Sequence, residues 1–263
     1  MRPVVHLCVV AVLAASGCSI GFGHADPGPR VIYADGFDGP PRAVQSPWRA
    51  VTGGGGWGND EVQVYTDSVE NARIDGHGHL AVIARRNDRG FTSARLSTKG
   101  ELSIRHGRIS ARIAVPAGAG LHPAFWMLGD DIDRVGWPAS GEIDIIETLN
   151  QASEYHTGVH VPGGPPSGRQ SVSATGIPPA PLAGTFRIYW VNKLPGLIQT
   201  GIDDRTLLTV TPADLEPGSR WVLDKPLHLL LNIAVGGTWP GPAGPTTPPE
   251  STMLVDWVRV VAP

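Results

Sequence analysis

The sequence predicts an all-β protein, a two-sheet antiparallel sandwich of the jelly-roll kind, and three observations support this fold class. Short alternating or apolar runs recur along the chain, and clusters of Gly, Pro, Asn and Asp separate them. Glycine (34) and proline (25) are abundant while 41% of the residues are hydrophobic, which indicates many turns together with enough apolar side chains for a core. No stretch keeps a long 3.6-residue period, so long helices are not expected.

The expected strands follow from those runs in order. Each run either alternates apolar with polar residues or is continuously apolar, and turn-forming residues bound it. The predicted strands are 61–65, 79–84, 105–115, 124–128, 142–148, 157–161, 185–191, 197–202, 228–235 and 253–261. Short helical turns are expected only at 211–216 and 219–225.

Residues 1–25 resemble an export signal, and residues 26–263 are expected to form one catalytic domain. Arg2 precedes an apolar stretch, 4–15, that is too short to span a bilayer. The sequence allows two ways of processing this signal. Cleavage after Ala25 would release a secreted protein, whereas acylation of Cys18 would anchor a lipoprotein in the cell envelope. Both place the domain outside the cytoplasm.

Composition excludes several classes of partner and site. A net charge of −3 and the absence of a basic run argue against nucleic-acid binding. Cys8 and Cys18 are the only cysteines, and both lie in the predicted signal. The mature domain is therefore expected to lack disulfides, a thiol nucleophile and a zinc–thiolate site.

The run GEIDIIE, residues 141–147, places three acids in an isoleucine-rich strand. Glu142 and Asp144 share strand parity, so both point to one face while the isoleucines pack on the other. Glu147 has the opposite parity and would be a buried, unpaired carboxylate in a regular strand. A β-bulge at Ile145 or Ile146 would return Glu147 to the face of Glu142.

This arrangement suggests glycoside hydrolysis. With strand residues about 3.3 Å apart, the two glutamates could bring their carboxyl groups to about 5–7 Å from each other. Retaining glycosidases use about 5–5.5 Å and inverting ones about 6.5–9.5 Å. The structural alternative is an acidic, solvent-facing sheet edge.

The chain resembles glycoside hydrolase family sixteen, in its laminarinase-like form with a bulged acidic strand. Besides GEIDIIE, five ordered segments carry the resemblance: 56–67 (GWGNDEVQVYTD), 106–129 (HGRISARIAVPAGAGLHPAFWMLG), 157–163 (TGVHVPG), 229–241 (LLLNIAVGGTWPG) and 255–261 (VDWVRVV). The resemblance implies a concanavalin-like jelly roll with a glycan cleft on its concave face. It also implies a retaining endo-β-1,3-glucanase that cleaves laminarin-like β-glucan, with mixed-linkage β-glucan as an open second substrate. We expect the protein to be a monomer.

By position, the resemblance makes Glu142 the nucleophile and Glu147 the general acid/base, with Asp144 supporting the nucleophile. Neighbouring carboxylates favour the protonated form of Glu147 by like-charge repulsion, and esterification of Glu142 then removes one of these charges. Alternatives on the same site are a β-glucan transglycosylase and a β-galactan hydrolase. A non-catalytic glycan-binding lectin is the alternative from another class, and it predicts loss of an acid, whereas all three are present.

Aromatic side chains are the expected substrate contacts, because sugar rings stack their CH faces on indole. The candidates are Trp57, Trp126, Trp137 and Trp239. A core position is the alternative for Trp126, and loop packing is the alternative for Trp137 and Trp239.

Three polar residues are further candidates for the cleft. For His160 the resemblance favours contact with sugar or with Glu147, whereas a structural histidine is the alternative. Asn232 interrupts an apolar strand, so its amide needs hydrogen-bond partners. It either binds substrate or forms hydrogen bonds within the sheet. Arg95 either braces the acids or forms a surface salt bridge.

A structural calcium ion is expected from the resemblance, with Asp256 of the closing strand as its ligand. In DGFDG, residues 35–39, Gly36 stands where the family has a glutamate, which removes one oxygen from an ion that prefers six to eight. No cofactor is needed for the expected catalysis.

Overall fold

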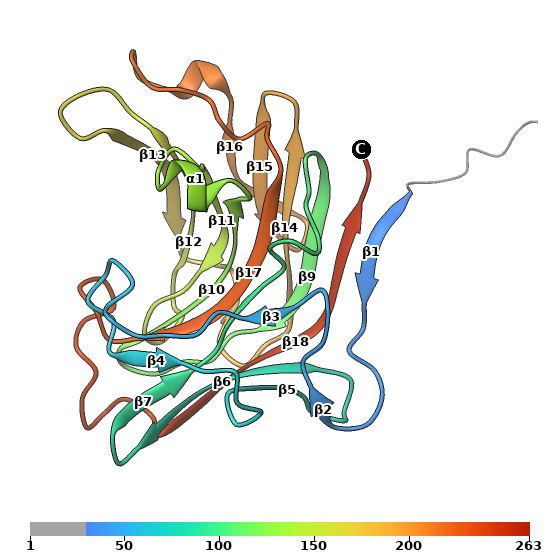
Figure 1. The fold of residues 1–263 in the computed structure, drawn as a ribbon, viewed down its shortest axis with the longest axis vertical. Coiled ribbons are helices and arrows are strands. Elements are labelled where there is room, and N and C mark those ends of the chain that lie inside the picture. The colour runs from blue at the N-terminus through green and yellow to red at the C-terminus, as the bar shows by residue number, and fades with distance from the viewer. Residues whose placement is uncertain (1–29) are drawn as a thin grey trace, which may run out of the picture.

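The structure, a computed structural model, describes residues 30–263 and consists of two β-sheets packed face to face (Figure 1). The predicted signal 1–25, including Cys18, lies outside the described residues. Within residues 30–263 no helix is long and apolar enough to cross a membrane.

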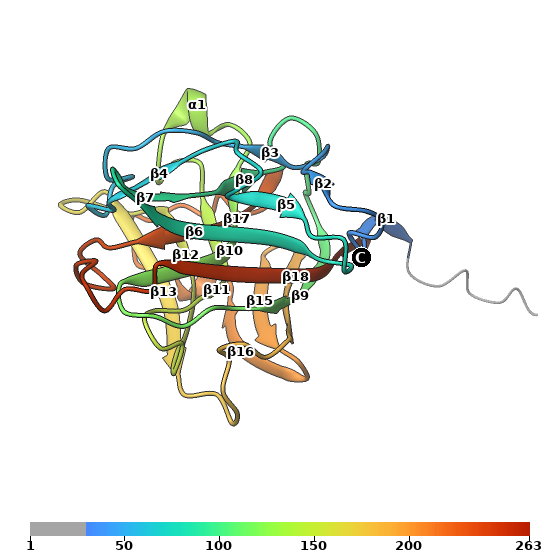
Figure 2. The ribbon, with the colours of Figure 1, turned by 90° about the horizontal axis from the view of Figure 1, so that it is seen from below.

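The larger sheet has eleven strands and is almost wholly antiparallel. Its strands are β1 (Val31–Asp35), β2 (Arg42–Ala43), β4 (Gln63–Tyr65), β5 (Ala72–Ile74), β6 (Leu80–Asn87), β7 (Gly90–Ser93), β9 (Gly107–Ala114), β14 (Arg187–Leu194), β15 (Leu197–Ile202), β16 (Arg205–Val210) and β18 (Glu250–Val261). They follow the order β16-β15-β14-β9-β18-β6-β5-β2, and β1 adds to β18 while β7 joins β6 to β4. Figure 2 shows β6 and β18 side by side in this sheet.

The smaller sheet has seven strands and carries the acidic run. Its strands are β3 (Arg49–Ala50), β8 (Arg95–Ser97), β10 (Leu121–Gly129), β11 (Glu142–Glu147), β12 (Tyr155–Pro162), β13 (Arg169–Gly176) and β17 (Leu227–Val235). The order β13-β12-β11-β10-β17-β8-β3 puts β11 near the middle of the sheet. One short helix, α1 (Ile132–Val135), and one 3₁₀ turn, Pro212–Asp214, complete the described chain.

The core lies between the two sheets. Alternate residues of each strand fill it, for example Val82 and Ile109 from the larger sheet and Phe125, Ile143 and Leu231 from the smaller one, all at most 1% exposed. Because strand side chains alternate between faces, the other face of the smaller sheet is free to present polar and aromatic residues.

The all-β sandwich prediction is confirmed, and every predicted strand segment contains a strand. The helical turn predicted at 211–216 is present as the 3₁₀ turn, whereas the one at 219–225 is wrong. That segment precedes Pro226, which disfavours helical geometry in the residue before it, and its Leu223 is fully buried. The sequence did not predict α1.

Candidate active site

The carboxylates of Glu142, Asp144 and Glu147 share one face of β11. On each neighbouring strand the three acids pair with every second residue, and every second residue of a strand points to the same face. The partners are His160, Gly158 and His156 on β12, and Leu128, Trp126 and Ala124 on β10. On both sides the register shifts between Asp144 and Glu147, and Ile145 is left without a partner on β10. The predicted bulge is therefore confirmed at Ile145, and Ile145 and Ile146 are both buried.

A hydroxyl in the core supports the backbone of this bulge. The Thr157 hydroxyl donates to the main-chain oxygen of Asp144 at 2.7 Å and lies 2.7 Å from the hydroxyl of Thr200. Both threonines are at most 2% exposed. Because a bulge interrupts the ladder, this bond satisfies a carbonyl at the place where the strand changes register.

His160 lies beside two of the three acids. Its Nε2 is 3.0 Å from Oδ2 of Asp144 and 3.8 Å from Oε1 of Glu142. Its Nδ1 is 2.6 Å from the Ser171 hydroxyl on β13. Of the two contacts expected for His160, the one with Glu147 is wrong, because His160 pairs with Glu142 and the register places His156 opposite Glu147. Contact of His160 with sugar stays a prediction.

Burial and mutual repulsion set the protonation of this cluster. Burial, then the charge of Asp144, raises the pKa of Glu142 to about 8, and burial, then the charge of Glu147, raises the pKa of Asp144 to about 6. Burial alone would lower the pKa of His160, but its bond to Asp144 and the charges of the acids raise it to about 9. The site therefore holds an imidazolium beside acids whose ionisation burial and mutual repulsion oppose and the His160 charge favours.

Glu147 has a different neighbour, His122 on β10. The Nε2 atom of His122 is 2.8 Å from Oε1 of Glu147. The rings of His122 and Trp239 are nearly perpendicular, at 5.0 Å between ring centroids, and the Trp239 ring also lies 4.8 Å from that of His156. His122 was not predicted from the sequence, although it shares strand parity with Ala124, the partner of Glu147.

Arg95 is stacked between two of the predicted tryptophans. Its guanidinium lies 4.8 Å from the Trp57 ring and 4.6 Å from the Trp126 ring. Trp57 adopts a positive φ of 48°, and its Nε1 donates to the oxygen of Gly53 at 3.3 Å. Within residues 30–263, Arg95 forms no surface ion pair and no direct bond to an acid, and burial lowers its pKa.

Asn232 holds Trp126 in this stack. The Nε1 of Trp126 donates to Oδ1 of Asn232 at 2.7 Å, and Nδ2 of Asn232 donates to the Tyr65 hydroxyl at 3.2 Å. Asn232 is therefore satisfied within the sheet, and its contact with substrate stays a prediction. Trp126 is half-buried on the face of the acids and not in the core.

Trp137 sits in the loop between β10 and β11 and is 43% exposed. Its ring lies 6.0 Å from that of His160, and Arg169 of β13 lies 5.6 Å from it. Trp239, at 44% exposed, contacts the histidines near Glu147. The two exposed indoles therefore lie on opposite sides of the acids, Trp137 on the side of Glu142 and Trp239 on the side of Glu147.

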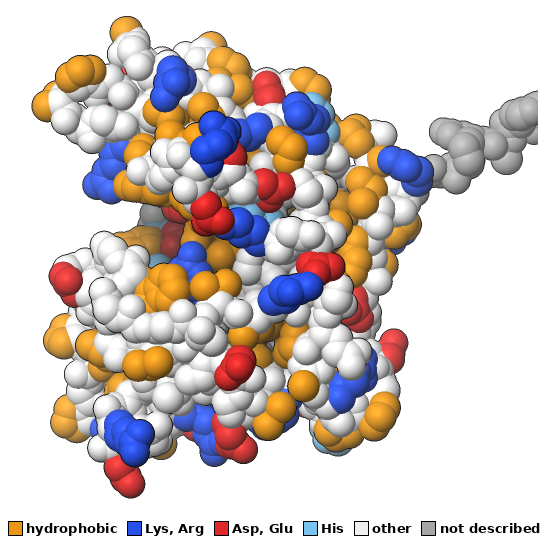
Figure 3. All heavy atoms as spheres, viewed as in Figure 1, with side chains coloured by type: hydrophobic (Ala, Val, Ile, Leu, Met, Phe, Trp, Pro, Cys, Tyr) orange, Lys and Arg blue, Asp and Glu red, His pale blue; other side chains and the backbone are white. Residues whose placement is uncertain are grey.

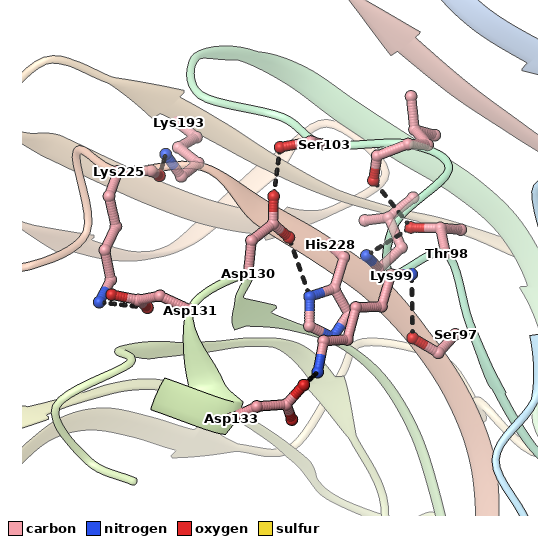
Figure 4. Close-up of polar contacts among 12 residues, drawn as sticks. Ser97, Thr98, Lys99, Ser103, Asp130, Asp131, Asp133, Lys193, Lys225 and His228 are labelled. Carbon is pink, nitrogen blue, oxygen red and sulfur yellow. Dashed lines mark hydrogen bonds and ion pairs between the residues drawn. The ribbon is translucent and has the colours of Figure 1, made fainter. Parts of the chain in front are cut away.

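A polar network built on the three lysines of the sequence holds the loop of Trp137 (Figure 4). Lys225 donates to Oδ1 of Asp131 and to the oxygen of Ala139, both at 2.8 Å, and so joins the two ends of the loop. The buried Lys193 donates to the main-chain oxygen of Lys225 at 2.9 Å, and burial lowers its pKa to about 8. Lys99 pairs with Asp133 of α1 at 2.5 Å.

The molecule is hollowed on the side of the smaller sheet, and this hollow is called the cleft (Figure 3). Figure 3 shows it between the lobe with β13 and α1 and the lobe with β4 and β7, with acidic side chains inside. Glu142, Asp144 and His160 have ligand atoms within 4.8 Å of one another, and they form the one possible metal-binding group of three or more such side chains in residues 30–263.

Asp256, the predicted calcium ligand, lies outside the cleft on β18. Its Oδ2 accepts from Nη1 of Arg112 at 2.5 Å, and the Arg112 guanidinium also stacks on Phe186 at 4.5 Å. A cation of the protein already neutralises this carboxylate, and Asp256 belongs to no cluster of three ligating side chains in the described chain. A calcium ion held by this carboxylate together with main-chain oxygens stays a prediction.

Comparison with known proteins agrees with this geometry. A model of the XgeA-like, catalytic GH16 domain matches residues 62–176. The beta-glucanase of Rhodothermus marinus is 36% identical over 265 residues, which covers 93% of this chain and 90% of that protein. The X-ray structure of endo-beta-1,3-glucanase from Pyrococcus furiosus has a TM-score of 0.81 and 36% identity, covering 89% of this chain and 94% of that one. The X-ray structure of the laminarinase from Rhodothermus marinus has a TM-score of 0.79 and 33% identity, covering 90% and 99%.

The jelly-roll fold and the row of acids define a glycosidase. The chain belongs to glycoside hydrolase family 16, as its motifs suggested.

Proposed function

We propose that this protein is a retaining endo-β-1,3-glucanase that hydrolyses internal bonds of laminarin-like glucans by double displacement. The observation that carries the proposal is the row of Glu142, Asp144 and Glu147 on one face of a bulged central strand. The similarity of the chain to a beta-glucanase over nearly its whole length supports β-glucan as the substrate class.

The surroundings of the two glutamates support a division of roles. The His160 imidazolium lies next to Glu142 and Asp144, so it stabilises negative charge there, and we assign the nucleophile to Glu142. Glu147 lies beyond direct contact with this cation and would hold the acid proton. The nucleophile attacks C1 of the sugar as Glu147 protonates the departing oxygen, and water then cleaves the ester with Glu147 as base.

The aromatic residues are assigned to binding. Trp126 is fixed by Arg95 and Asn232 on the cleft face, so it offers a rigid surface for a sugar ring. Trp137 and Trp239 are exposed on opposite sides of the acids and would contact the glucan on either side of the cleaved bond. This assignment needs no metal or cofactor.

The test is to incubate residues 26–263 with laminarin, lichenan and agarose and to analyse the products by chromatography. We expect laminarin to yield a ladder of oligosaccharides whose new reducing ends are initially β. Binding of laminarin without cleavage would instead establish a lectin, cleavage of agarose alone a galactan hydrolase, and products longer than the substrate a transglycosylase.

The nucleophile assignment has its own test. Glu142→Ala removes the attacking carboxylate, so laminarin hydrolysis should fall below detection. Azide, entering from the vacated side, should restore cleavage with an α-linked glycosyl azide as the product. A β-linked azide would show that Glu142 is not the nucleophile.

We also propose that the domain is exported and is either secreted or held in the envelope by a lipid on Cys18. The basis is the sequence alone, an apolar segment that ends near Cys18. Mass spectrometry of the mature N-terminus separates the two forms, since secretion predicts Asp26 as the first residue and anchoring predicts an acylated Cys18.

A further inference from the structure

His122 is the one side chain of β10 that bonds directly to Glu147, and the proposed reaction assigns it no role. Its Nε2 is 2.8 Å from Oε1 of Glu147, and His122 is only 9% exposed. The Trp239 ring packs on the His122 ring at 5.0 Å between centroids, nearly perpendicular to it. Pairing of β10 with β11 over Ala124 and Glu147 fixes this approach, so the contact belongs to the sheet and not to a loop.

The second ring nitrogen indicates where the proton of His122 lies. Nδ1 is buried and has no hydrogen-bond partner among residues 30–263. An N–H placed there would be an unsatisfied buried donor, which costs more than leaving an unused lone pair. The neutral imidazole therefore carries its hydrogen on Nε2 and donates it to Oε1 of Glu147.

This bond leaves one oxygen of Glu147 for the reaction. Oε1 accepts from His122, so a proton on Glu147 resides on Oε2. When that proton leaves, the carboxylate that remains keeps a hydrogen bond that becomes stronger, because bonds to charged acceptors exceed those to neutral ones. Stabilising a charge that appears during the reaction lowers the barrier.

We propose that His122 is a positioning residue that places the acid proton of Glu147 on Oε2 and stabilises the carboxylate formed when this proton is transferred. The inference rests on the proposed glucanase function. In the first step the Oε2 proton moves to the glycosidic oxygen while the C1–O bond breaks and a Glu142 oxygen bonds to C1. In the second step water gives its proton back to Oε2 and its oxygen to C1, while the bond between C1 and Glu142 breaks and Glu142 leaves as a carboxylate. His122 keeps its own proton throughout.

The charged groups that surround His122 favour this role. Glu147 and Asp144 of β11 and Glu61, which precedes β4, act on it as negative charges, and His156 of β12 lies across Trp239. The bond to Glu147 and these acids raise the pKa of His122 although burial opposes the shift. The neutral ring with its hydrogen on Nε2 and the imidazolium both donate to Glu147, so the hydrogen bond does not depend on the charge of His122.

The test uses substrates that differ in their need for an acid. A dinitrophenyl β-laminaribioside releases a stable anion and needs no proton from Glu147, whereas the departing sugar of laminarin does. His122→Leu removes the donor at similar volume, and His122→Gln keeps an N–H near the position of Nε2. His77→Leu, in an exposed turn of the larger sheet, controls for loss of a histidine.

For His122→Leu we expect kcat/KM on laminarin to fall about ten- to hundredfold, the value of one hydrogen bond to a charged group. The value on the aryl glycoside should stay within about twofold of wild type, which also shows that the variant folds. His122→Gln should recover most of the loss, and His77→Leu should show none.

Each other outcome is decisive. Equal losses on both substrates, or no loss on either, would overturn the role of His122 while the glucanase function stands. Failure of Gln to recover activity on laminarin would do the same. If wild type cleaves neither substrate, the proposed function itself is wrong.

Discussion

The imidazole of His160 bridges two strands by contacting Asp144, with Nε2 3.0 Å from Oδ2, while Nδ1 lies 2.6 Å from the hydroxyl of Ser171. Both ring nitrogens therefore have oxygen partners, as an imidazolium that donates twice requires. Its pKa is raised to about 9 by the neighbouring acids, so the charge persists at neutral pH. The cleft thus contains its own counter-ion for the proposed nucleophile.

Replacing His160 by Gln should move the acidic limb of the pH–rate profile to higher pH. The His160 charge lowers the pKa values of Glu142 and Asp144, against the larger effect of burial. Without it, ionised Glu142 forms only at higher pH, so kcat/KM at pH 6 should fall about tenfold for each pH unit by which this limb moves. The measurement is kcat/KM on laminarin between about pH 4 and 9, with His77→Gln as the control. An acidic limb that stays in place would contradict this role of the imidazolium.

Replacing Glu142 by Gln should stabilise the fold, and increasingly so as the pH rises. The pKa of Glu142 is raised from 4.5 to about 8, so folded protein binds this proton more tightly than unfolded chain. The resulting stability is fully present below about pH 4.5 and is lost as the pH rises through 8. The variant lacks this loss, so its advantage in free energy of unfolding should grow by up to about 1.4 kcal/mol per pH unit.

Urea unfolding of both proteins at about pH 5, 6.5 and 8 measures this difference. Glu101→Gln is the matched control, because Glu101 lies far from the acids and pairs with the exposed Arg49. Two stability curves that run parallel across this range would show that burial of Glu142 imposes no such cost.

The sequence predicted those strands whose own residues form an apolar or alternating run. β17 is apolar at every position except His228 and Asn232, and a run of this kind needs no partner to be recognised. β13 was missed because Arg, Gln, Ser and Thr occupy it and its exposed and half-buried positions alternate without a buried face. β8 is three residues long, too short for a period to appear.

The acids could be placed from the sequence because parity is a local property, and the misfit of Glu147 indicated the bulge. Contacts between distant strands were not available in this way. Asp256 is paired with Arg112 of β9, 144 residues earlier in the chain, and this pair could not be predicted from the sequence. His122 approaches Glu147 only through the pairing of β10 with β11.

Replacing Lys225 by Met should weaken substrate binding more than catalysis. Lys225 joins Asp131 and Ala139 across the loop that carries Trp137, so its loss frees this indole without touching the acids. We expect KM for laminarin to rise severalfold with kcat nearly unchanged, and stability to fall by about 1–3 kcal/mol.

Lys99→Met is the control for the loss of a lysine near α1. Its pair with Asp133 is largely exposed, and such pairs contribute about 0–1 kcal/mol. Steady-state kinetics and thermal melts of the two variants decide the question. Equal effects of both substitutions would mean that the joined loop ends have no special part in holding Trp137.

Replacing Thr157 by Val should damage the bulge and therefore the reaction. Valine matches threonine in shape, but it leaves the main-chain oxygen of Asp144 buried without its 2.7 Å donor. An unsatisfied buried carbonyl costs about 1–3 kcal/mol, and relaxation of the bulge to reach another donor would displace Glu147 relative to Glu142. Since a displacement of about 1 Å can cost about a hundredfold in rate, kcat on laminarin should fall well beyond the change in KM.

Thr200→Val is the matched control for this substitution. It removes the neighbouring hydroxyl while Asp144 keeps its donor, so this variant should lose less stability and keep its kcat. Urea unfolding and steady-state kinetics of the pair test the coupling between the buried hydroxyl and the row of acids. A Thr157→Val enzyme with the kcat of Thr200→Val would refute it, because the bulge would then hold Glu147 in place without the Thr157 bond.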